Sequence, residues 1–277
     1  MNSHKDKIVI ITGASSGIGL ACAKAFAAKC CKIVLAARSI DKLKKTEAEL
    51  LAAGVEVLAV QTDVSQEADC QALIEKAVER FGGVDVLVNN AGVSMRALFQ
   101  DIDLTVIKRL MDVNFWGTVY CTKYALPYLL ERKGSVVGIT SISGFKGLPA
   151  RTGYSASKFA MFGFLETLRI EHLYNGLHVM IMAPGFTSSN IRKAALTADG
   201  STQNETPRNE NKMMSAEKVA ACLIKGVCKR KYQMVLTPLG KATVWINKFF
   251  PRFVDRMSYK EMAIEPNSPL KRKRRHP

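Results

Sequence analysis

The stretch that decides the fold lies at residues 7–19 and reads KIVIITGASSGIG. Its first half is a short run of β-branched residues, which predicts a buried strand over residues 7–12. Its second half is a glycine-rich turn, and apolar residues at helical spacing follow over residues 18–28. A buried strand that passes through a glycine turn directly into a helix is the starting unit of a parallel α/β sheet.

Outward from this unit, short apolar runs alternate with longer amphipathic patterns along most of the chain. The alternation predicts a single doubly wound parallel sheet with helices on both faces. The predicted strands are Lys7–Thr12, Lys32–Ala36, Val55–Val60, Val84–Val88, Ser135–Thr140, His178–Ala183 and Gln233–Leu236. The predicted helices are Ile18–Ala28, Ile40–Ala53, Gln66–Phe81, Leu104–Glu131, Gly153–Tyr174 and Ser215–Lys229.

The glycine-rich turn is a candidate site for the phosphates of a dinucleotide. Gly13 permits a tight turn, Gly17 lets the backbone approach a pyrophosphate, and Gly19 lets helix and strand pack closely. The helix N-terminus offers unpaired N–H groups and partial positive charge to a phosphate. An ordinary loop can also be rich in glycine, so the position after the first strand carries this prediction. The other contacts expected from the turn are Ser15, Ser16 and Ile18.

The end of the second predicted strand indicates which dinucleotide is bound, and residues 36–39 read AARS. An NAD enzyme usually has an Asp or Glu near this point to bind the ribose 2′-hydroxyl. Here small neutral residues are followed by Arg38 and Ser39, and a guanidinium can bind a 2′-phosphate through charge-assisted hydrogen bonds. A solvated arginine that opens a helix is the alternative interpretation. The missing carboxylate favours NADP(H).

Polar and glycine residues also follow later predicted strands, at the edge where open parallel sheets bind ligands. Tyr154 and Lys158 are four residues apart in a predicted helix, so their side chains share one face. A nearby ammonium stabilises a phenolate, which predicts a lowered pKa and an acid/base role for Tyr154. Ser141, at the end of the fifth predicted strand, is placed to donate a hydrogen bond to a substrate oxygen. Each residue taken alone also fits a structural role.

These motifs, in this order, resemble the short-chain dehydrogenase/reductase family over roughly residues 5–235. The motifs concerned are Thr12–Gly19, Asn89–Gly92, Asn114, Ser141, Tyr154 with Lys158, and Pro184-Gly185. The resemblance implies a Rossmann-type sheet of about seven strands in the order 3-2-1-4-5-6-7. It also implies homodimers or homotetramers, built through the helices predicted at residues 104–131 and 153–174.

The resemblance further implies a role for each residue of the site. Tyr154 is then the acid/base, Lys158 tunes it and holds the nicotinamide ribose, and Ser141 orients the carbonyl. Asn114 holds a water for a proton relay. The remaining cofactor contacts implied are Asp63 and Val64 at the adenine, Asn90, Ala91 and Gly92 at its ribose, and Pro184, Gly185 and Thr187 at the nicotinamide.

The substrate class rests on a looser likeness. Residues 247–253 and 262–266 are similar to hydroxysteroid-dehydrogenase-like and 3-ketosphinganine-reductase-like branches, which implies a bulky apolar, lipid-like or steroid-like carbonyl compound. The polar stretch at residues 188–211 predicts either a mobile lid or a disordered segment, and we assign it to a lid over residues 186–214. Residues 241–262 predict two amphipathic helices interrupted at Pro251. Their apolar side is interpreted as core packing or subunit contact, or as a pocket wall or membrane-surface foot. A non-catalytic module that senses NADP(H) is the alternative to an enzyme.

The chain is strongly basic, with a formal net charge of +16, and residues 271–275 read KRKRR. A solvated face and a disordered tail explain this excess, and the alternative is attraction to anionic lipid, an anionic substrate or nucleic acid, with nucleic acid the least favoured. The predicted division is a Rossmann domain (1–240), a helical extension (241–265) and a tail (266–277). The polar residues 1–7 predict no signal peptide. The seven cysteines include no C-x-x-C pair, which predicts reduced thiols and no metal site. Together these features predict a cytoplasmic protein, and the alternative is a peripheral membrane location.

Overall fold

The predicted sheet is confirmed in the computed structural model, which describes residues 5–188, 190–206 and 213–271. Seven strands, all parallel, pair in the order β3-β2-β1-β4-β5-β6-β7. This order matches the one implied by the family resemblance. The strands are β1 (Ile8–Thr12), β2 (Lys32–Ala37), β3 (Val57–Gln61), β4 (Val86–Asn89), β5 (Ser135–Ile139), β6 (His178–Ala183) and β7 (Gln233–Val235).

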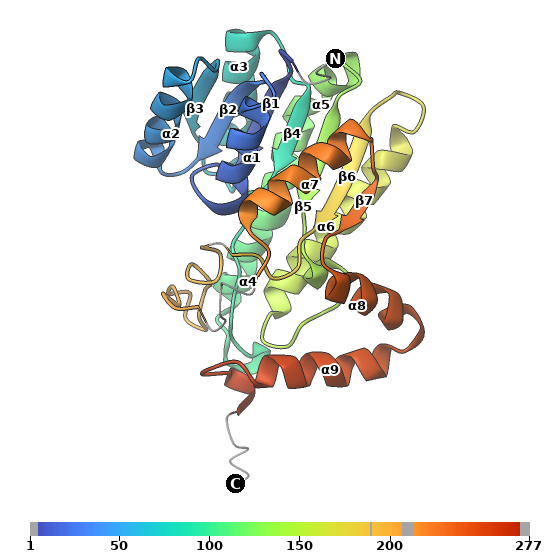
Figure 1. The fold of residues 1–277 in the computed structure, drawn as a ribbon. Coiled ribbons are helices and arrows are strands. Elements are labelled where there is room, and N and C mark those ends of the chain that lie inside the picture. Colours follow the sequence, from blue (N-terminus) through green and yellow to red (C-terminus); the bar gives the residue numbers. More distant parts are fainter. Residues whose placement is uncertain (1–4, 189, 207–212, 272–277) are drawn as a thin grey trace.

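Helices cover both faces of the sheet, so the central strands read as continuous apolar runs (Figure 1). Alternate residues of β1 divide between the two layers, with Val9 and Ile11 in one core cluster and Ile10 in the other. The first layer is built by α1 (Gly17–Ala27), α2 (Ile40–Ala52) and α7 (Ala216–Cys228), and the second by α3 (Glu67–Phe81), α5 (Gly117–Glu131) and α6 (Thr152–Glu171).

The long helix predicted over residues 104–131 is present but is not uniform. It consists of α4 (Leu104–Leu110), a π-helical segment (Met111–Trp116) and α5. Asp103 caps the start, because its carboxylate accepts a hydrogen bond from the backbone N–H of Thr105 at 2.8 Å. The π-helical segment contains Asn114, and such segments are frequent at functional sites because they displace one side chain from the regular helical register.

Two helices continue the chain beyond the carboxyl edge of the sheet (Figure 1). Pro238 and Pro251 stand at the first positions of α8 (Pro238–Phe249) and α9 (Pro251–Ala263), where the missing N–H of proline costs no hydrogen bond. The predicted interruption at Pro251 is therefore confirmed, although α8 begins before the residue 241 that was expected. No helix in the described ranges is long and apolar enough to span a bilayer.

The segment after α9 was predicted to be disordered from residue 266, and for residues 266–271 this prediction is wrong. Ser268 is buried, and its hydroxyl donates a hydrogen bond of 2.8 Å to the carbonyl of Met262. Arg96 donates a hydrogen bond to the carbonyl of Pro266. These contacts fix the chain as far as a short 3-10 turn (Pro269–Lys271), and residues 272–277 lie outside the described residues.

The described residues of the lid predicted over residues 186–214 form turns and isolated bridges rather than a helix or a strand. A short bridge between Leu196 and Met95 ties the loop to the segment after β4, and a second bridge, between Thr187 and Met214, joins the two ends of the loop to each other. Leu196 is buried with Met95 and Leu110 in a small separate core. Residue 189 and residues 207–212 of the predicted lid lie outside the described residues.

Candidate active site

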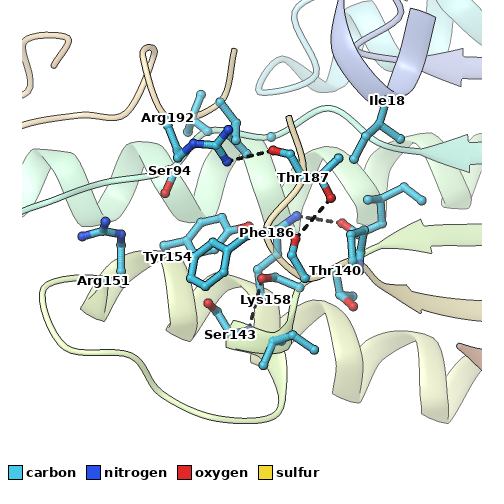
Figure 2. Close-up of a pocket in the computed structure, with 18 of the residues that line it drawn as sticks. Ile18, Ser94, Thr140, Ser143, Arg151, Tyr154, Lys158, Phe186, Thr187 and Arg192 are labelled. Atoms are coloured by element: carbon cyan, nitrogen blue, oxygen red, sulfur yellow. Dashed lines mark hydrogen bonds between the residues drawn. The ribbon is translucent and has the colours of Figure 1, made fainter. Parts of the chain in front are cut away.

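A cavity of about 740 Å³ runs along the carboxyl edge of the sheet. Most residues predicted to bind the cofactor or the substrate line it, and Tyr154 and Lys158 reach it from the first turns of α6 (Figure 2). The predicted residues that line the cavity are Gly13, Ser15, Ser16, Gly17, Ile18, Arg38, Ser39, Asp63, Val64, Asn90, Ala91, Gly92, Ser141, Tyr154, Lys158, Pro184, Gly185 and Thr187. Two predicted residues, Gly19 and Asn114, are not among the lining residues, and each has a separate place described below.

The glycine turn has the shape that a pyrophosphate requires. Gly13 and Gly17 adopt φ values of +67° and +54°, a region that side chains disfavour. A Cβ atom on Gly19 would collide with the carbonyl oxygen of Gly13, so Gly19 acts in packing rather than in contact with the cavity. The side chain of Ser16 does not cap the start of α1 in the described contacts, and the first turn of α1 contains no acidic residue. The N–H groups of this helix therefore suit an anion.

A hydrogen-bond network fixes the glycine turn to the end of β4. The hydroxyl of Thr12 accepts hydrogen bonds of 3.0 Å from the backbone N–H groups of Asn90 and Ala91. The side-chain amide of Asn90 donates in return to the carbonyl oxygens of Thr12, at 2.8 Å, and Gly13, at 3.3 Å. Asn90 thus positions the glycine turn, and these hydrogen bonds explain why the motif has an asparagine at this place.

At the end of β2 the cavity is bordered by cations. Arg38 and Lys42 both line it and are both exposed, and they are four residues apart across the start of α2. Sequence reasoning missed Lys42, although its spacing from Arg38 was a usable signal. Asp63, the predicted cofactor contact that carries a carboxylate, also lines the cavity and accepts hydrogen bonds from the backbone N–H and the hydroxyl of Ser65 at 3.0 and 2.8 Å. This end of the cavity therefore has an excess of positive charge.

Tyr154 is half-buried beside Ser141, and the two share a hydrogen bond. Burial raises the pKa of the Tyr154 phenol above its usual value, while the hydrogen bond with Ser141 and the charge of Arg151 lower the pKa by less. The direction is opposite to that predicted from the Tyr154–Lys158 spacing, because desolvation of the phenolate outweighs the neighbouring charges. The phenol is consequently protonated at neutral pH.

Lys158 is only 2% exposed, one helical turn from Tyr154. Its ammonium donates a hydrogen bond of 2.9 Å to the carbonyl of Ile139 at the end of β5, and it lies 5.9 Å from the centre of the Tyr154 ring. Burial lowers the pKa of Lys158 to about 7. The prediction that the two side chains share one face of the helix is confirmed. The prediction that Lys158 lowers the pKa of Tyr154 is not confirmed, because the groups that lower this pKa are Ser141 and Arg151.

Asn114 is fully buried. Its amide nitrogen donates to the hydroxyl of Ser157 at 2.8 Å and to the carbonyl of Val93 at 3.0 Å, while its side-chain oxygen accepts from the Val93 backbone N–H at 2.8 Å. These bonds fix the loop after β4 to the face of α6 that carries Lys158. Asn114 is therefore a positioning residue in the described contacts, and its predicted role in a water relay stays a prediction.

A buried ionic cluster that the sequence did not reveal borders the substrate end of the cavity. One carboxylate oxygen of Glu265 lies 3.5 Å from Nε of Arg96 and 3.4 Å from Nη2 of Arg151. Arg151 and Glu265 both line the cavity. The C-terminal segment is thereby tied to the residue whose charge acts on Tyr154. No short-range pattern could have predicted this contact, because Arg151 and Glu265 are 114 positions apart.

The lid contributes a further cation. Arg192 donates a hydrogen bond of 2.8 Å to the carbonyl of Thr187, as Figure 2 shows. Thr187 is buried, and its hydroxyl donates to the carbonyl of Gly185 at 3.2 Å. The segment after β6 is thus ordered where the predicted contacts Pro184, Gly185 and Thr187 line the cavity.

The far wall of the cavity is apolar and comes mainly from the helical extension. Large side chains of α8 and α9 face those of the loop after β5 and of the lid. The residues concerned are Leu148, Phe186, Leu239, Ile246, Phe253, Val254, Met257 and Met262. The predicted interpretation of residues 241–262 as the wall of an apolar pocket agrees with this lining.

The chain matches the family described as short chain dehydrogenase over residues 7–200. It is 36% identical over 238 residues to dehydrogenase/reductase SDR family member 7B of Mus musculus, which covers 84% of this chain and 74% of that protein. It is 33% identical over 250 residues to 11-beta-hydroxysteroid dehydrogenase-like 4A of Arabidopsis thaliana, with 90% and 82% covered.

Two solved structures have the same fold. A short chain dehydrogenase/reductase from Burkholderia phymatum in complex with NAD superposes with a TM-score of 0.81 and 27% identity, covering 91% of this chain and 96% of that one. An alcohol dehydrogenase from Thermococcus sibiricus complexed with 5-hydroxy-NADP superposes with a TM-score of 0.75 and 27% identity, covering 84% and 96%. The two complexes contain different dinucleotides, so the cofactor preference of this chain depends on its own residues.

Proposed function

The chain belongs to the short-chain dehydrogenase family of oxidoreductases, and from this premise we propose that it uses NADP(H) to reduce the ketone of a bulky apolar substrate or to oxidise the matching secondary alcohol. One observation carries the proposal. A buried lysine, a half-buried tyrosine and a serine meet in a single cavity, between a cationic cofactor end and an apolar wall.

The residues at the cofactor end fit a dinucleotide phosphate. The start of α1 offers N–H groups to the pyrophosphate, and Gly13 and Gly17 leave room for it beside the backbone. Arg38 and Lys42 supply two positive charges at the end of β2, where a 2′-phosphate distinguishes NADP(H) from NAD(H). When bound, the nicotinamide supplies or accepts the hydride at the substrate carbon.

The protein residues then handle the proton and the oxygen atom of the substrate. The carbonyl oxygen accepts hydrogen bonds from Ser141 and Tyr154, and as the carbon gains the hydride the oxygen takes the phenolic proton of Tyr154. A raised pKa keeps that proton on Tyr154 at neutral pH, which suits reduction. Lys158 holds the ribose through its ammonium, whose buried position is fixed by the carbonyl of Ile139. In the reverse direction Tyr154 takes the proton of the alcohol.

The apolar wall supports a bulky hydrophobic substrate. Side chains of Leu239, Ile246 and Phe253 would bury rings or chains of a lipid-like or steroid-like molecule at about 25 cal/mol per Å² of apolar surface. The name of the Arabidopsis relative, a hydroxysteroid dehydrogenase-like protein, gives independent support for substrates of this size. A small hydrophilic ketone would leave this apolar wall without a hydrophobic group to contact it.

The test is a panel of ketones assayed by consumption of NADPH and of NADH. The panel contains steroid ketones, 3-ketosphinganine, β-ketoacyl esters and quinones, with a small water-soluble ketone as reference. We expect turnover of bulky ketones with NADPH and a loss of at least about a hundredfold in kcat for Tyr154→Phe. The matched control is Tyr174→Phe, because Tyr174 is exposed and lies just beyond the far end of α6. NADPH binding without turnover of any ketone would indicate a sensing module and would overturn the proposal.

A further inference from the structure

The outer side of α8 is apolar and cationic at the same time. Trp245 and Phe249 lie one turn apart with ring centres 5.5 Å from each other, and they are 64% and 62% exposed. Lys241 and Lys248 are exposed on the same helix. The residues of α8 that line the cavity, such as Ile246, lie on another side of the helix. A large exposed aromatic pair is a costly feature for a protein surface unless something covers it.

The outer side of α9 continues this surface with more positive charge. Arg252, Arg256 and Lys260 recur every four residues and therefore form one exposed stripe. The two acidic residues of the helix do not lie on this stripe. Asp255 is paired with Lys146 at 2.5 Å, and Glu261 lines the cavity. Helices α8 and α9 pack against each other, and their exposed outer residues are called here the α8–α9 face, which consists of Lys241, Trp245, Lys248, Phe249, Phe250, Arg252, Arg256, Tyr259 and Lys260.

The cavity opens beside this surface. Leu239, Phe253 and Met257 line the cavity, yet each of them is also more than half exposed to solvent. A side chain can be both only where the lining of a cavity reaches the surface of the molecule. The mouth of the apolar cavity therefore lies at the edge of the α8–α9 face. Helices α8 and α9 themselves lie at the end of the molecule beyond the sheet (Figure 1).

We propose that the α8–α9 face docks on the surface of an anionic lipid bilayer, with the apolar mouth of the cavity at the lipid interface. Tryptophan, phenylalanine and tyrosine interleaved with lysine and arginine form the pattern of helices that lie in such an interface. The lipid origin of the substrate rests on the proposed function, whereas the docking itself does not. The net charge of +16 attracts the whole chain to an anionic membrane, and the aromatic residues select the side that inserts.

Charge distinguishes this partner from a second copy of the chain. In a symmetric dimer the same patch meets itself, so the cationic stripe of α9 would face an identical stripe. The segment from α8 to α9 contains five basic and two acidic residues, and of the two acids Asp255 is paired with Lys146 and Glu261 lines the cavity. A self-contact would therefore oppose like charges around the aromatic residues, whereas anionic lipid headgroups neutralise them.

The test uses the fluorescence of Trp245. The chain has two tryptophans, so the variant Trp116→Phe leaves Trp245 as its single reporter. We expect its emission to shift to shorter wavelength with vesicles made of equal parts of phosphatidylcholine and phosphatidylserine, and the protein to float with those vesicles. Vesicles of phosphatidylcholine alone should bind it much more weakly, because they carry no net charge. An unshifted emission in the presence of anionic vesicles would overturn the proposal.

Two pairs of variants locate the binding surface. Lys248→Glu with Arg252→Glu should weaken binding to anionic vesicles by at least about tenfold, whereas Lys45→Glu with Lys76→Glu, which changes the net charge equally, should weaken it much less. Phe249→Ser with Phe250→Ser should also weaken binding, and Tyr174→Ser, at an exposed aromatic residue elsewhere, should not. Equal losses in the two charge pairs would mean nonspecific attraction and would overturn the assignment to this face.

Three further measurements separate the alternatives. Deletion of residues 272–277 should leave the Trp245 shift in place, and complete loss of binding on this deletion would assign it to the tail. Sedimentation of the Lys248→Glu, Arg252→Glu variant should show an unchanged oligomeric state, since a change would indicate a subunit contact. Tyr154→Phe should bind vesicles normally without turnover, so that docking and catalysis fail independently.

Discussion

The Tyr154 side chain experiences two opposed influences on its acidity. Burial raises the pKa of the phenol, while Ser141 and Arg151 lower it. Arg151 is itself paired with Glu265, so a residue of the segment after α9 fixes a charge that acts on the Tyr154 phenol. In the proposed mechanism the oxidation of an alcohol depends on ionisation of Tyr154, so the pH dependence of oxidation should respond to changes at Arg151.

Replacement of Arg151 by methionine removes a positive charge near Tyr154, which should raise the pKa of the phenol further. Because alcohol oxidation requires the phenolate, the alkaline rise of kcat against pH should move to higher pH, while ketone reduction at neutral pH is less affected. Arg151→Lys keeps the charge and is the control. An unchanged pH profile in Arg151→Met would show that this charge does not reach the phenol.

Arg38 and Lys42 form the cationic end of the cavity. Replacement of Arg38 by aspartate should raise the KM for NADPH by roughly ten- to a hundredfold, since a charge-assisted hydrogen bond is worth about 1.5–3 kcal/mol. The same change should lower the KM for NADH, because a carboxylate can accept the ribose 2′-hydroxyl. Lys42→Ala should weaken NADPH binding to a smaller degree. The control is Lys45→Asp, on the same helix but outside the cavity lining, which should alter neither KM. If the unmodified enzyme preferred NADH to NADPH, the assignment of Arg38 to the 2′-phosphate would be wrong.

At the scale of elements, the segment after α9 acts as a brace across the substrate end of the cavity. Glu265 is buried between Arg96 and Arg151, and the carbonyl of Pro266 accepts a further bond from Arg96. Arg96 belongs to the loop after β4 and Arg151 precedes α6. The brace therefore joins the helical extension to two segments of the Rossmann fold that also border the active site.

Removal of the charge of Glu265 should loosen this brace. Glu265→Gln leaves two largely buried guanidinium groups without their shared carboxylate, which should cost about 2 kcal/mol and lower the Tm by about 5 °C. Glu205→Gln is the matched control, because Glu205 is 54% exposed and lies 3.9 Å from Arg96. Differential scanning calorimetry of both variants measures the difference. Equal Tm values for Glu265→Gln and Glu205→Gln would rule out a structural role for the buried carboxylate.

The same elements explain what could and could not be predicted from the sequence. Strands, the glycine turn and the Tyr154–Lys158 pair are local patterns, so their places at the sheet edge follow from the parallel topology. Lys42 was missed although its spacing from Arg38 was visible. The contact of Glu265 with Arg151, and the order of residues 266–271, depend on packing between distant segments that no local pattern records. The predicted direction of the Tyr154 pKa shift is wrong, because residue spacing reveals which groups are neighbours but not how deeply they are buried.

For the whole molecule, the active site imposes a cost on stability. Lys158 is buried with its pKa lowered to about 7, whereas the lysine of an unfolded chain has a pKa near 10.4. Between these values the unfolded chain binds more protons than the folded one, so the free energy of unfolding rises with pH through that window. Below pH 7 the penalty is fully present, and above about pH 10.4 it is absent.

Replacement of Lys158 by methionine, which has a similar length and no charge, should therefore stabilise the protein at neutral pH while it abolishes turnover. We expect the Tm, measured without added nucleotide, to rise by about 5 °C at pH 7, and the advantage to shrink as the pH approaches 10. The exposed Lys45→Met variant should show no such pH-dependent difference. A Lys158→Met protein less stable than the parent at every pH would mean that the hydrogen bond from Lys158 to Ile139 outweighs the cost of burying the ammonium.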